Sequence, residues 1–225
     1  IAFGQPVQTF DFAYRDKDKV YHEDRNLTPQ EFYQKYVGMS LRDYVPVIHE
    51  PTPDKPLHRL IQFHGIENMS DSDMKALHLS QEELEELCIK QLKAGQAVWF
   101  ACDAGAFGAR KDGVWDPDSV QYEALLGGFS TDMPKGERLQ YGSSSATHAM
   151  LLTGVHFDAD GKADRWKIEN SWGKDVGDQG YFVCSAKYFK EYVYEAVIDG
   201  RHFSPEQAAM LKTEPVVINA WDEDA

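Results

Sequence analysis

The chain has 225 residues, of which 42% are hydrophobic and 27% are charged, and these ordinary globular values exclude a wholly disordered chain. Its 23 basic and 37 acidic residues give a net charge of −14. That charge argues against a general nucleic-acid-binding protein, because such proteins need a basic face to neutralise phosphates. The length predicts one large domain or two small ones, at about 150 residues per domain.

The sequence carries no signal for a membrane or for secretion. No apolar run reaches the ~20 residues that a membrane-spanning helix needs, and no basic and apolar leader opens the chain. Because the first residue is Ile1 rather than Met, we expect a processed, clipped or excerpted product. The three cysteines, Cys88, Cys102 and Cys184, are odd in number and widely spaced, which predicts a reducing, cytoplasmic compartment rather than a disulfide framework.

Capping boxes mark three predicted helices. In such a box a Ser or Thr side chain and a Glu or Gln three residues later satisfy each other's backbone amides. The boxes begin at Thr28, Ser80 and Ser204, and they predict helices to about residue 37, residue 95 and residue 211. The second helix presents apolar residues on one face. These residues are Leu84, Leu87, Cys88 and Leu92.

Apolar or alternating runs predict six strands. They lie at residues 57–64, 97–101, 149–155, 165–170, 180–184 and 193–198. The run 149–155 is continuously apolar and is predicted to be buried on both faces. In the run 165–170, Trp166, Ile168 and Asn170 face one way and charged residues face the other.

The remaining segments complete the prediction of the fold class. Residues 5–24 and 45–56 are expected to be irregular, and residues 103–118 to form a Gly-rich loop. The second half of the chain is mostly strand with short connections, so the helices are expected mainly from the first half. This pattern predicts an antiparallel sheet or partial barrel combined with helices, which is the α+β class.

Candidate chemistry concentrates between Gly142 and Tyr181. His148 stands at the mouth of one predicted strand, and Asn170 ends the next one. A buried amide without a partner costs about 1–3 kcal/mol, so Asn170 needs one, and His148 is a candidate. An imidazole whose tautomer is fixed by an amide oxygen is the base that a thiolate nucleophile requires, and the indole of Trp172 would exclude water from the pair. A purely structural His–Asn pair is the alternative.

Other clusters match no site pattern. They are the serines 143–145, the glutamates 82, 83, 85 and 86, Asp71 with Asp73, the glycines 105, 108 and 113, and His156. The serines lack the elbow of a serine nucleophile and are predicted to form a flexible polar loop. The glutamates fit the solvated face of the second helix, the aspartates lack an EF-hand pattern, and the glycines lack the dinucleotide fingerprint. The histidine is predicted at the surface. No metal-ligand spacing occurs, so no structural metal is expected.

Several blocks resemble the papain-like cysteine peptidases. Four lie in the second half: Glu137-Arg138-Leu139, Thr147 to Met150, Trp166 to Gly173, and Gly177 to Tyr181. Others, spread over the whole chain, make the resemblance closer to the bleomycin hydrolase and aminopeptidase C branch. They are Tyr14 to Lys19, Thr28-Pro29 with Glu31-Phe32-Tyr33, Ala97 to Phe100 with Cys102-Asp103, Glu191 to Glu195, Glu214-Pro215, and Ala220-Trp221-Asp222.

The resemblance implies a papain-like fold, of which this chain resembles the β-rich right-hand half with helical elaborations. It implies a helical and irregular region with some barrel strands at residues 1–135, and a β-rich catalytic region with a C-terminal tail at residues 136–225. By the same resemblance His148 is the catalytic base and acid, Asn170 orients it, and Trp172 shields the pair.

The nucleophilic cysteine of the family has no matching block here. In the family it comes early in the chain, at the start of a long helix and after a glutamine. Cys88, Cys102 and Cys184 are instead predicted to be buried small hydrophobes. We therefore expect the C-terminal portion of an intracellular cysteine aminopeptidase, inactive alone and completed by an N-terminal segment that bears the cysteine.

The resemblance also implies peptide substrates, a hexameric homo-oligomer and no cofactor. In relatives the C-terminal carboxylate binds the substrate amino group. Here the match ends at Trp221-Asp222 and is followed by Glu223-Asp224-Ala225, so an endopeptidase variant is one alternative. A non-catalytic structural or interaction subunit with a papain-like fold is the other.

Overall fold

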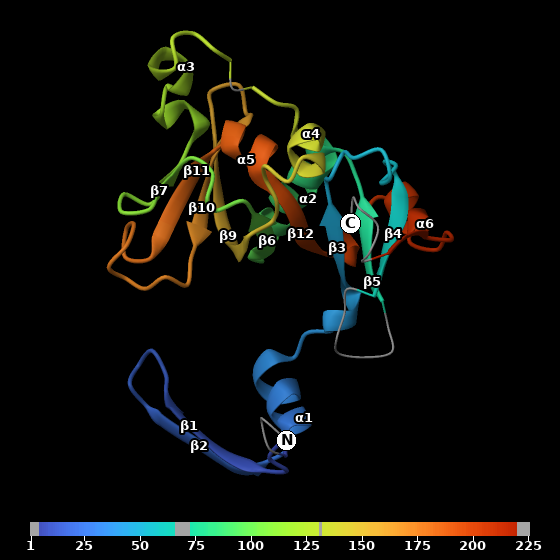
Figure 1. Cartoon of the computed structure of the whole chain (residues 1–225). Coiled ribbons are helices and arrows are strands. Elements are labelled where there is room, and N and C mark those ends of the chain that lie inside the picture. The colour runs from blue at the N-terminus through green and yellow to red at the C-terminus, as the bar shows by residue number, and fades with distance from the viewer. Residues whose placement is uncertain (1–4, 66–72, 131, 220–225) are drawn as a thin grey trace. The chain divides into compact units, whose positions relative to one another are not determined.

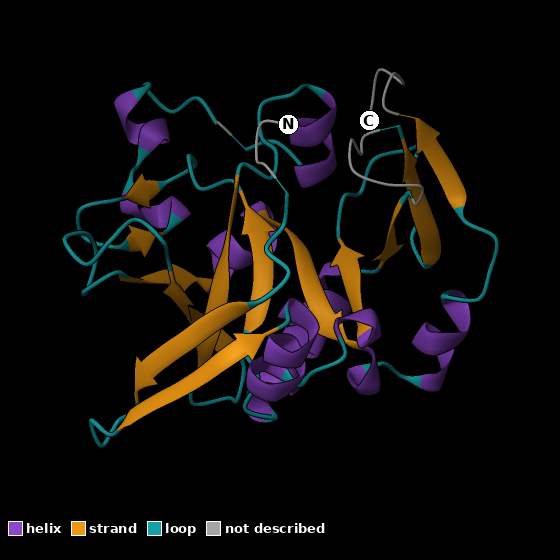
Figure 2. Cartoon of the chain, turned by 90° about the horizontal axis from the view of Figure 1, so that it is seen from below, coloured by secondary structure: helices purple, strands orange, loops and turns teal. Residues whose placement is uncertain are grey.

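The computed structural model describes residues 5–65, 73–130 and 132–219 (Figures 1 and 2). The chain divides into two compact units, residues Ile1–Arg42 and Asp43–Ala225. Asp71 and the tail from Ala220 onward, on which two of the sequence expectations rest, lie outside the described residues. Within the described part of the chain, no helix is both long enough and apolar enough to cross a membrane.

The first unit is a β-hairpin followed by one short helix. Its elements are β1 (Phe10–Arg15), β2 (Tyr21–Leu27), α1 (Pro29–Phe32) and a π-helical turn (Tyr33–Val37). The two strands pair antiparallel, so the prediction of irregular chain over residues 5–24 is wrong. The hairpin closes because the Asp16 carboxylate accepts backbone hydrogen bonds from Asp18 and Val20, each 2.9 Å long. The predicted capping box at Thr28 is confirmed.

The described residues of the second unit are built on one mixed 11-stranded sheet. In spatial order its strands are β13 (Val216–Asn219), β4 (Arg59–His64), β5 (Met74–His78), β3 (Tyr44–Ile48), β12 (Val193–Asp199), β6 (Val98–Cys102), β9 (His148–Phe157), β10 (Ala163–Glu169), β11 (Tyr181–Ser185), β8 (Val114–Trp115) and β7 (Gly108–Ala109). The six predicted strands are confirmed as β4, β6, β9, β10, β11 and β12. The stretches 45–56 and 103–118, predicted without strands, contain β3 and the β7–β8 pair.

The sheet is open, with β13 and β7 at its edges among the described residues. Three strand pairs are parallel, namely β13–β4, β3–β5 and β11–β8. The prediction of an antiparallel sheet is wrong for these pairs, because each joins strands that do not follow one another in the chain and local patterns do not specify such pairings.

In the described part of the second unit, the chain forms five helices. They are α2 (Gln81–Lys93), α3 (Tyr122–Leu125), α4 (Lys135–Gln140), α5 (Ala186–Tyr192) and α6 (Pro205–Met210). Short 3-10 turns lie at Pro117–Ser119 and Gly200–His202, and another, Leu41–Asp43, lies at the boundary of the two units in the sequence. The predicted boxes at Ser80 and Ser204 cap α2 and α6. Because α4, α5 and α6 all follow residue 134, the expectation that the first half supplies most helices is wrong. The α+β class itself is confirmed.

The core lies between the sheet and its two principal helices. α2 packs against β6, β9 and β12, and α5 packs against β10, β11 and β12. Leu84 and Leu87 of α2 are fully buried, and Trp166 of β10 stacks on Phe189 of α5 with ring centroids 4.2 Å apart. β9 is not buried on both faces as predicted. Leu152 is 0% exposed, whereas Leu151 is 37% exposed on the opposite face.

Candidate active site

The backbone of the sheet fixes the position of His148. This half-buried residue begins β9, and its Cα partner across the antiparallel β6 pairing is Cys102. The residue before it, Thr147, donates its backbone N–H to the carbonyl oxygen of Cys102 over 3.0 Å. His148 therefore stands at the first position of β9, where hydrogen bonds between adjacent strands hold its backbone.

Asn170 lies immediately after β10, the strand that pairs with β9. Nε2 of His148 lies 2.9 Å from Oδ1 of Asn170, which also accepts the backbone N–H of Ser171 over 2.8 Å. The backbone N–H of Ser171 can only donate, and this identifies the Asn170 atom that it meets as the amide oxygen. Because an amide oxygen only accepts, Nε2 carries the proton, and the lone pair of the neutral imidazole is on Nδ1. This tautomer leaves Nδ1 as the atom that can take up a proton.

The amide nitrogen of Asn170 is less well satisfied. Nδ2 is buried and has no hydrogen-bond partner among the described residues. An unsatisfied buried amide group costs about 1–3 kcal/mol. The sequence argument that this amide needs a partner therefore holds for its oxygen and not for its nitrogen.

Trp172 covers the His148 ring. The two rings stack with centroids 5.0 Å apart and 19° between their planes. The indole is held in turn by Phe182, whose ring meets it edge-on at 5.6 Å, and by Trp115 at 5.9 Å. The guanidinium of Arg110 lies 4.4 Å from the indole centroid, a cation–π contact. Sequence reasoning missed Trp115, Phe182 and Arg110, because only the tertiary pairing of β8 with β11 brings them here.

Two glycines let the loop around Trp172 close on β8. A Cβ added to Gly113 would lie 2.6 Å from the Cα of Gly177, and one added to Gly177 would lie 2.4 Å from the carbonyl oxygen of Tyr181. Both residues also have a positive φ, which disfavours side chains. Glycine at both positions thus permits the close backbone approach that holds the loop carrying Trp172.

None of the three cysteines is placed as a nucleophile. Cys88, Cys102 and Cys184 are each 0% exposed. Burial raises the pKa of the Cys102 thiol to about 12 and the pKa of the other two well above the usual value. A thiolate is the reactive form, so these environments disfavour it strongly.

The serines at 143–145, Gly105 and His156, which matched no site pattern in the sequence, have different environments in the structure. The prediction of a flexible loop at residues 143–145 is wrong for Ser144, which is 5% exposed and hydrogen-bonded to Asp103 and Tyr194. Gly105, on which no function was placed, donates its backbone N–H to Asp103. His156 is exposed, as predicted, and pairs with Asp164.

The glutamates of α2 do not all lie on a solvated face. Glu82 and Glu86 are exposed, but Glu83 and Glu85 are half-buried. Glu83 completes the capping box and accepts from His58, whereas burial raises the pKa of Glu85. The prediction is therefore wrong for these two side chains.

Asp73 and the described histidines do not form a metal centre. Asp73 accepts from Gln62 over 2.7 Å and pairs with His64. Over residues 5–65, 73–130 and 132–219, no group of three or more His, Cys, Asp or Glu side chains is arranged to hold a metal ion.

A cavity of about 850 Å³ lies away from the His148–Asn170 pair. Tyr122, Arg138 and Tyr192 are among the residues that line it, and neither His148 nor Asn170 does.

Comparison with known proteins decides the family. The whole chain, residues 1–225, matches the Peptidase C1-like family. The chain belongs to this family. Among curated relatives of this Peptidase C1-like chain, aminopeptidase C of Lactococcus lactis subsp. cremoris is 41% identical over 223 residues, which are 99% of the chain and 51% of the relative. Bleomycin hydrolase of Homo sapiens is 37% identical over 228 residues, covering 99% of the chain and 50% of the relative.

A solved structure agrees with the family assignment. The crystal structure of PepW from Lactobacillus rhamnosis HN001 is 43% identical in sequence and superposes with a TM-score of 0.92. The match covers 98% of the present chain and 50% of the PepW chain. The predicted resemblance and the papain-like α+β fold are thus confirmed. The Peptidase C1-like chain spans about half the length of the relatives it matches.

Proposed function

We propose that residues 1–225 form the His/Asn-bearing portion of a cysteine aminopeptidase of the aminopeptidase C and bleomycin hydrolase type. The observation that carries the proposal is the geometry around His148. Its Nε2 lies 2.9 Å from the Asn170 oxygen, and Trp172 stacks on its ring. In this proposal His148 is the base and acid, Asn170 orients it, and Trp172 shields their hydrogen bond from water.

The chemistry follows from the tautomer. A thiol beside Nδ1 of His148 transfers its proton to that nitrogen, and the thiolate attacks the carbonyl carbon of the scissile bond. The imidazolium then protonates the leaving amine, and an acyl-thioester remains. His148 next takes a proton from water while the water oxygen attacks the thioester carbon. The C–S bond then breaks, the acid leaves, and the imidazolium returns its proton to the thiolate. Throughout, Asn170 keeps accepting from Nε2 and holds the ring in place.

The thiol is proposed to come from a segment outside residues 1–225. Two observations support this. The three thiols of the chain are fully buried with raised pKa values, and the matching relatives are about twice as long as the chain. Residues 136–225 then supply the base and the tail, while residues 1–135 supply the family-specific region and the remaining strands. Alone, the chain would be inactive.

The same proposal covers the substrate, the location, the oligomeric state and the cofactor of the complete enzyme. We infer peptide substrates, a cytoplasmic location, a homo-oligomer of six copies and no cofactor, from the resemblance to the aminopeptidase C branch. Aminopeptidase specificity is distinguished from an endopeptidase variant by comparing peptides with free and N-acetylated amino termini. Preference for the free amine supports the aminopeptidase assignment, and equal turnover of both contradicts it.

A pair of histidine variants tests the proposed base. In the complete enzyme, with residues 1–225 joined to the thiol-bearing segment, His148→Ala should abolish peptide hydrolysis. His156→Ala is the matched control, because His156 lies on the same strand, is exposed and is hydrogen-bonded to Asp164 and Arg165. Retention of full activity by His148→Ala would refute the assignment and favour a non-catalytic structural or interaction subunit.

A further inference from the structure

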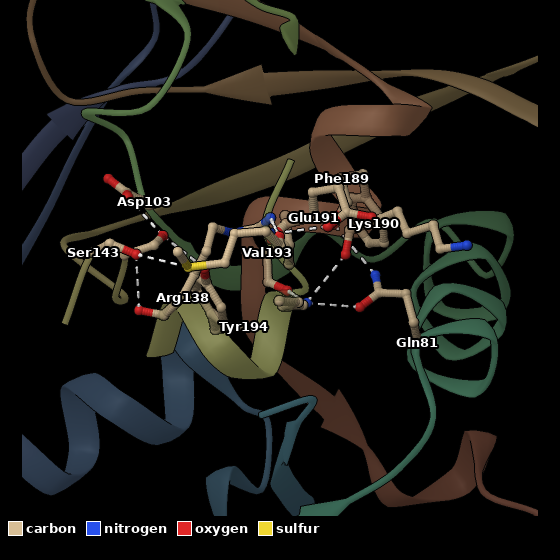
Figure 3. Close-up of polar contacts among 12 residues, drawn as sticks. Gln81, Asp103, Arg138, Ser143, Phe189, Lys190, Glu191, Val193 and Tyr194 are labelled. Atoms are coloured by element: carbon tan, nitrogen blue, oxygen red, sulfur yellow. Dashed lines mark hydrogen bonds and ion pairs between the residues drawn. The ribbon is translucent and has the colours of Figure 1, made fainter. Parts of the chain in front are cut away.

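One buried serine anchors the loop that leads into His148. Residues 141–143 and 145–147 are exposed, whereas Ser144 between them is only 5% exposed. Its Oγ lies 2.7 Å from Oδ2 of Asp103 and 2.7 Å from the phenol oxygen of Tyr194. Figure 3 shows Asp103 and Tyr194 approaching this loop from separate segments of the chain. The two hydrogen bonds of this buried hydroxyl therefore fix the loop at its centre.

The three side chains form a directional chain of hydrogen bonds. The carboxylate of Asp103 only accepts, so the single proton of the Ser144 hydroxyl goes to Asp103. Ser144 must then accept from the phenol of Tyr194. Burial raises the pKa of Tyr194, which keeps the phenol protonated and able to donate. A buried network in which every member is satisfied is rigid and specifies one arrangement.

The half-buried Asp103 is itself held by further hydrogen bonds. Its Oδ1 accepts from the backbone N–H of Gly105 over 3.1 Å. Its backbone N–H donates to the carbonyl of Tyr192 over 3.0 Å, and its own carbonyl accepts from the Tyr188 phenol over 2.6 Å. Ser144 is therefore bonded to a carboxylate whose own side chain and backbone are hydrogen-bonded to neighbouring segments.

The same short segment holds the loop a second time, next to His148. The backbone N–H of Ala104 donates to Oγ1 of Thr147 over 3.1 Å, and Thr147 donates to the carbonyl of Cys102. Residues 102–104 are thus hydrogen-bonded to the loop at Ser144 and at Thr147. Cys102 is also the strand partner of His148. Residues 102–104 therefore set the backbone path of the loop immediately before β9 begins.

We propose that Tyr194, Ser144 and Asp103 are positioning residues, which set the path of residues 144–147 and so the direction in which His148 presents its ring to Asn170. The inference rests on the proposed function, in which His148 is the base. It adds three residues whose effect on His148 passes through the backbone of residues 144–147. Loss of the chain of hydrogen bonds would loosen the His148–Asn170 contact without removing either side chain.

The test is made on the 225-residue chain with the variant Ser144→Ala. Its readout is the tautomer of His148 and the solvent exchange of its Nε2 proton, both measured by ¹⁵N NMR. In Ser144→Ala we expect exchange to become faster by about tenfold, the effect of losing one hydrogen bond to a charged group. Ser145→Ala is the matched control, since Ser145 is exposed, and it should behave as the wild type.

Two further variants separate the links of the chain. Tyr194→Phe removes the donor to Ser144 but keeps the ring, so we expect the same acceleration. Asp103→Asn keeps an acceptor oxygen for Ser144, so we expect a smaller effect. Thermal unfolding of every variant is measured alongside, because a purely structural network would lower the midpoint without changing the His148 proton.

The outcomes are distinguishable. A lowered midpoint in Ser144→Ala with unchanged exchange and tautomer of His148 would overturn the positioning role and leave the proposed function standing. Absence of the Nε2-protonated tautomer in the wild-type chain itself would instead count against His148 as the oriented base. Faster exchange in Ser144→Ala and Tyr194→Phe, with Ser145→Ala unchanged, supports the inference.

Discussion

The indole of Trp172 lies nearly parallel to the imidazole of His148, with 5.0 Å between the ring centroids and 19° between the planes. One face of the histidine is therefore covered by an apolar ring, and the hydrogen bond from Nε2 to Asn170 lies beside that cover. Exclusion of water strengthens such a bond, because the surrounding dielectric is lower than that of solvent.

Removal of this indole should expose the His148–Asn170 bond. In Trp172→Ala we expect the Nε2 proton of His148 to exchange with solvent faster than in wild type, and Trp172→Phe should lie between the two. The control is Trp99→Ala, which deletes an indole that is 40% exposed on β6. Proton exchange measured by NMR checks the prediction, and equal rates in Trp172→Ala and wild type would contradict the shielding role.

Two adjacent leucines on β9 should differ sharply in their contribution to stability. Leu152 is 0% exposed and Leu151 is 37% exposed. Leu152→Ala leaves a cavity in the core and should lower the free energy of unfolding by about 2–5 kcal/mol. Leu151→Ala should cost about 1 kcal/mol or less, because most surface substitutions have small effects. Urea unfolding of both variants decides the matter, and similar losses would mean that the burial of β9 is wrongly described.

The three helices marked by capping boxes could be predicted because a cap is a local signal. Thr28, Ser80 and Ser204 each accept from a backbone N–H three residues later, within the stretch of sequence that was read. α4 could not be found in this way, since its N-cap is Pro134 and makes no side-chain hydrogen bond. α5 is capped by Ser185, but Tyr188 at the third position cannot complete a box.

The site was predictable only in part, for the same reason. His148, Asn170 and Trp172 stand in blocks that can be read along the chain, and the structure brings them together. Arg110 reaches Trp172 only through the fold, and Ser144 looked like one of several loop serines. Its burial depends on Asp103 and Tyr194, which are distant in sequence. The parallel strand pairs were missed on the same ground, because pairing between distant segments leaves no local pattern.

Glu195 should make the stability of the chain depend on pH. Burial, together with the nearby Glu50, raises the pKa of Glu195 to about 7. The folded state therefore binds a proton that the unfolded state releases at about pH 4.3, so stability falls as the pH rises toward 7. Glu195→Gln removes this loss, and we expect it to be more stable than wild type above pH 7 by about 1–3 kcal/mol.

The control for this experiment is Glu169→Gln, an exposed glutamate at the end of β10. It should follow the wild type at every pH. Urea unfolding at pH 4 and pH 8 is the measurement. Equal stability of Glu195→Gln and wild type at both pH values would show that this carboxyl keeps its ordinary pKa.

The native thiols should be inert. Cys88, Cys102 and Cys184 are fully buried, and burial raises the pKa of each. We expect no alkylation of the folded chain by iodoacetamide at pH 8, and alkylation of all three thiols in denaturant. Mass spectrometry counts the adducts. Rapid modification of Cys102, the strand partner of His148, would reopen the question of a nucleophile within the chain.

The central claim is that His148 and Asn170 serve a thiol supplied from outside residues 1–225. The most direct measurement is denaturing intact-mass analysis of the native material after treatment with a thiol-alkylating epoxide inhibitor of cysteine peptidases. We predict a second polypeptide, or a longer parent chain, that carries a single epoxide adduct, with none on Cys88, Cys102 or Cys184. A lone species at the chain's own 25.6 kDa without any adduct, or an adduct on one of those three cysteines, would contradict the claim.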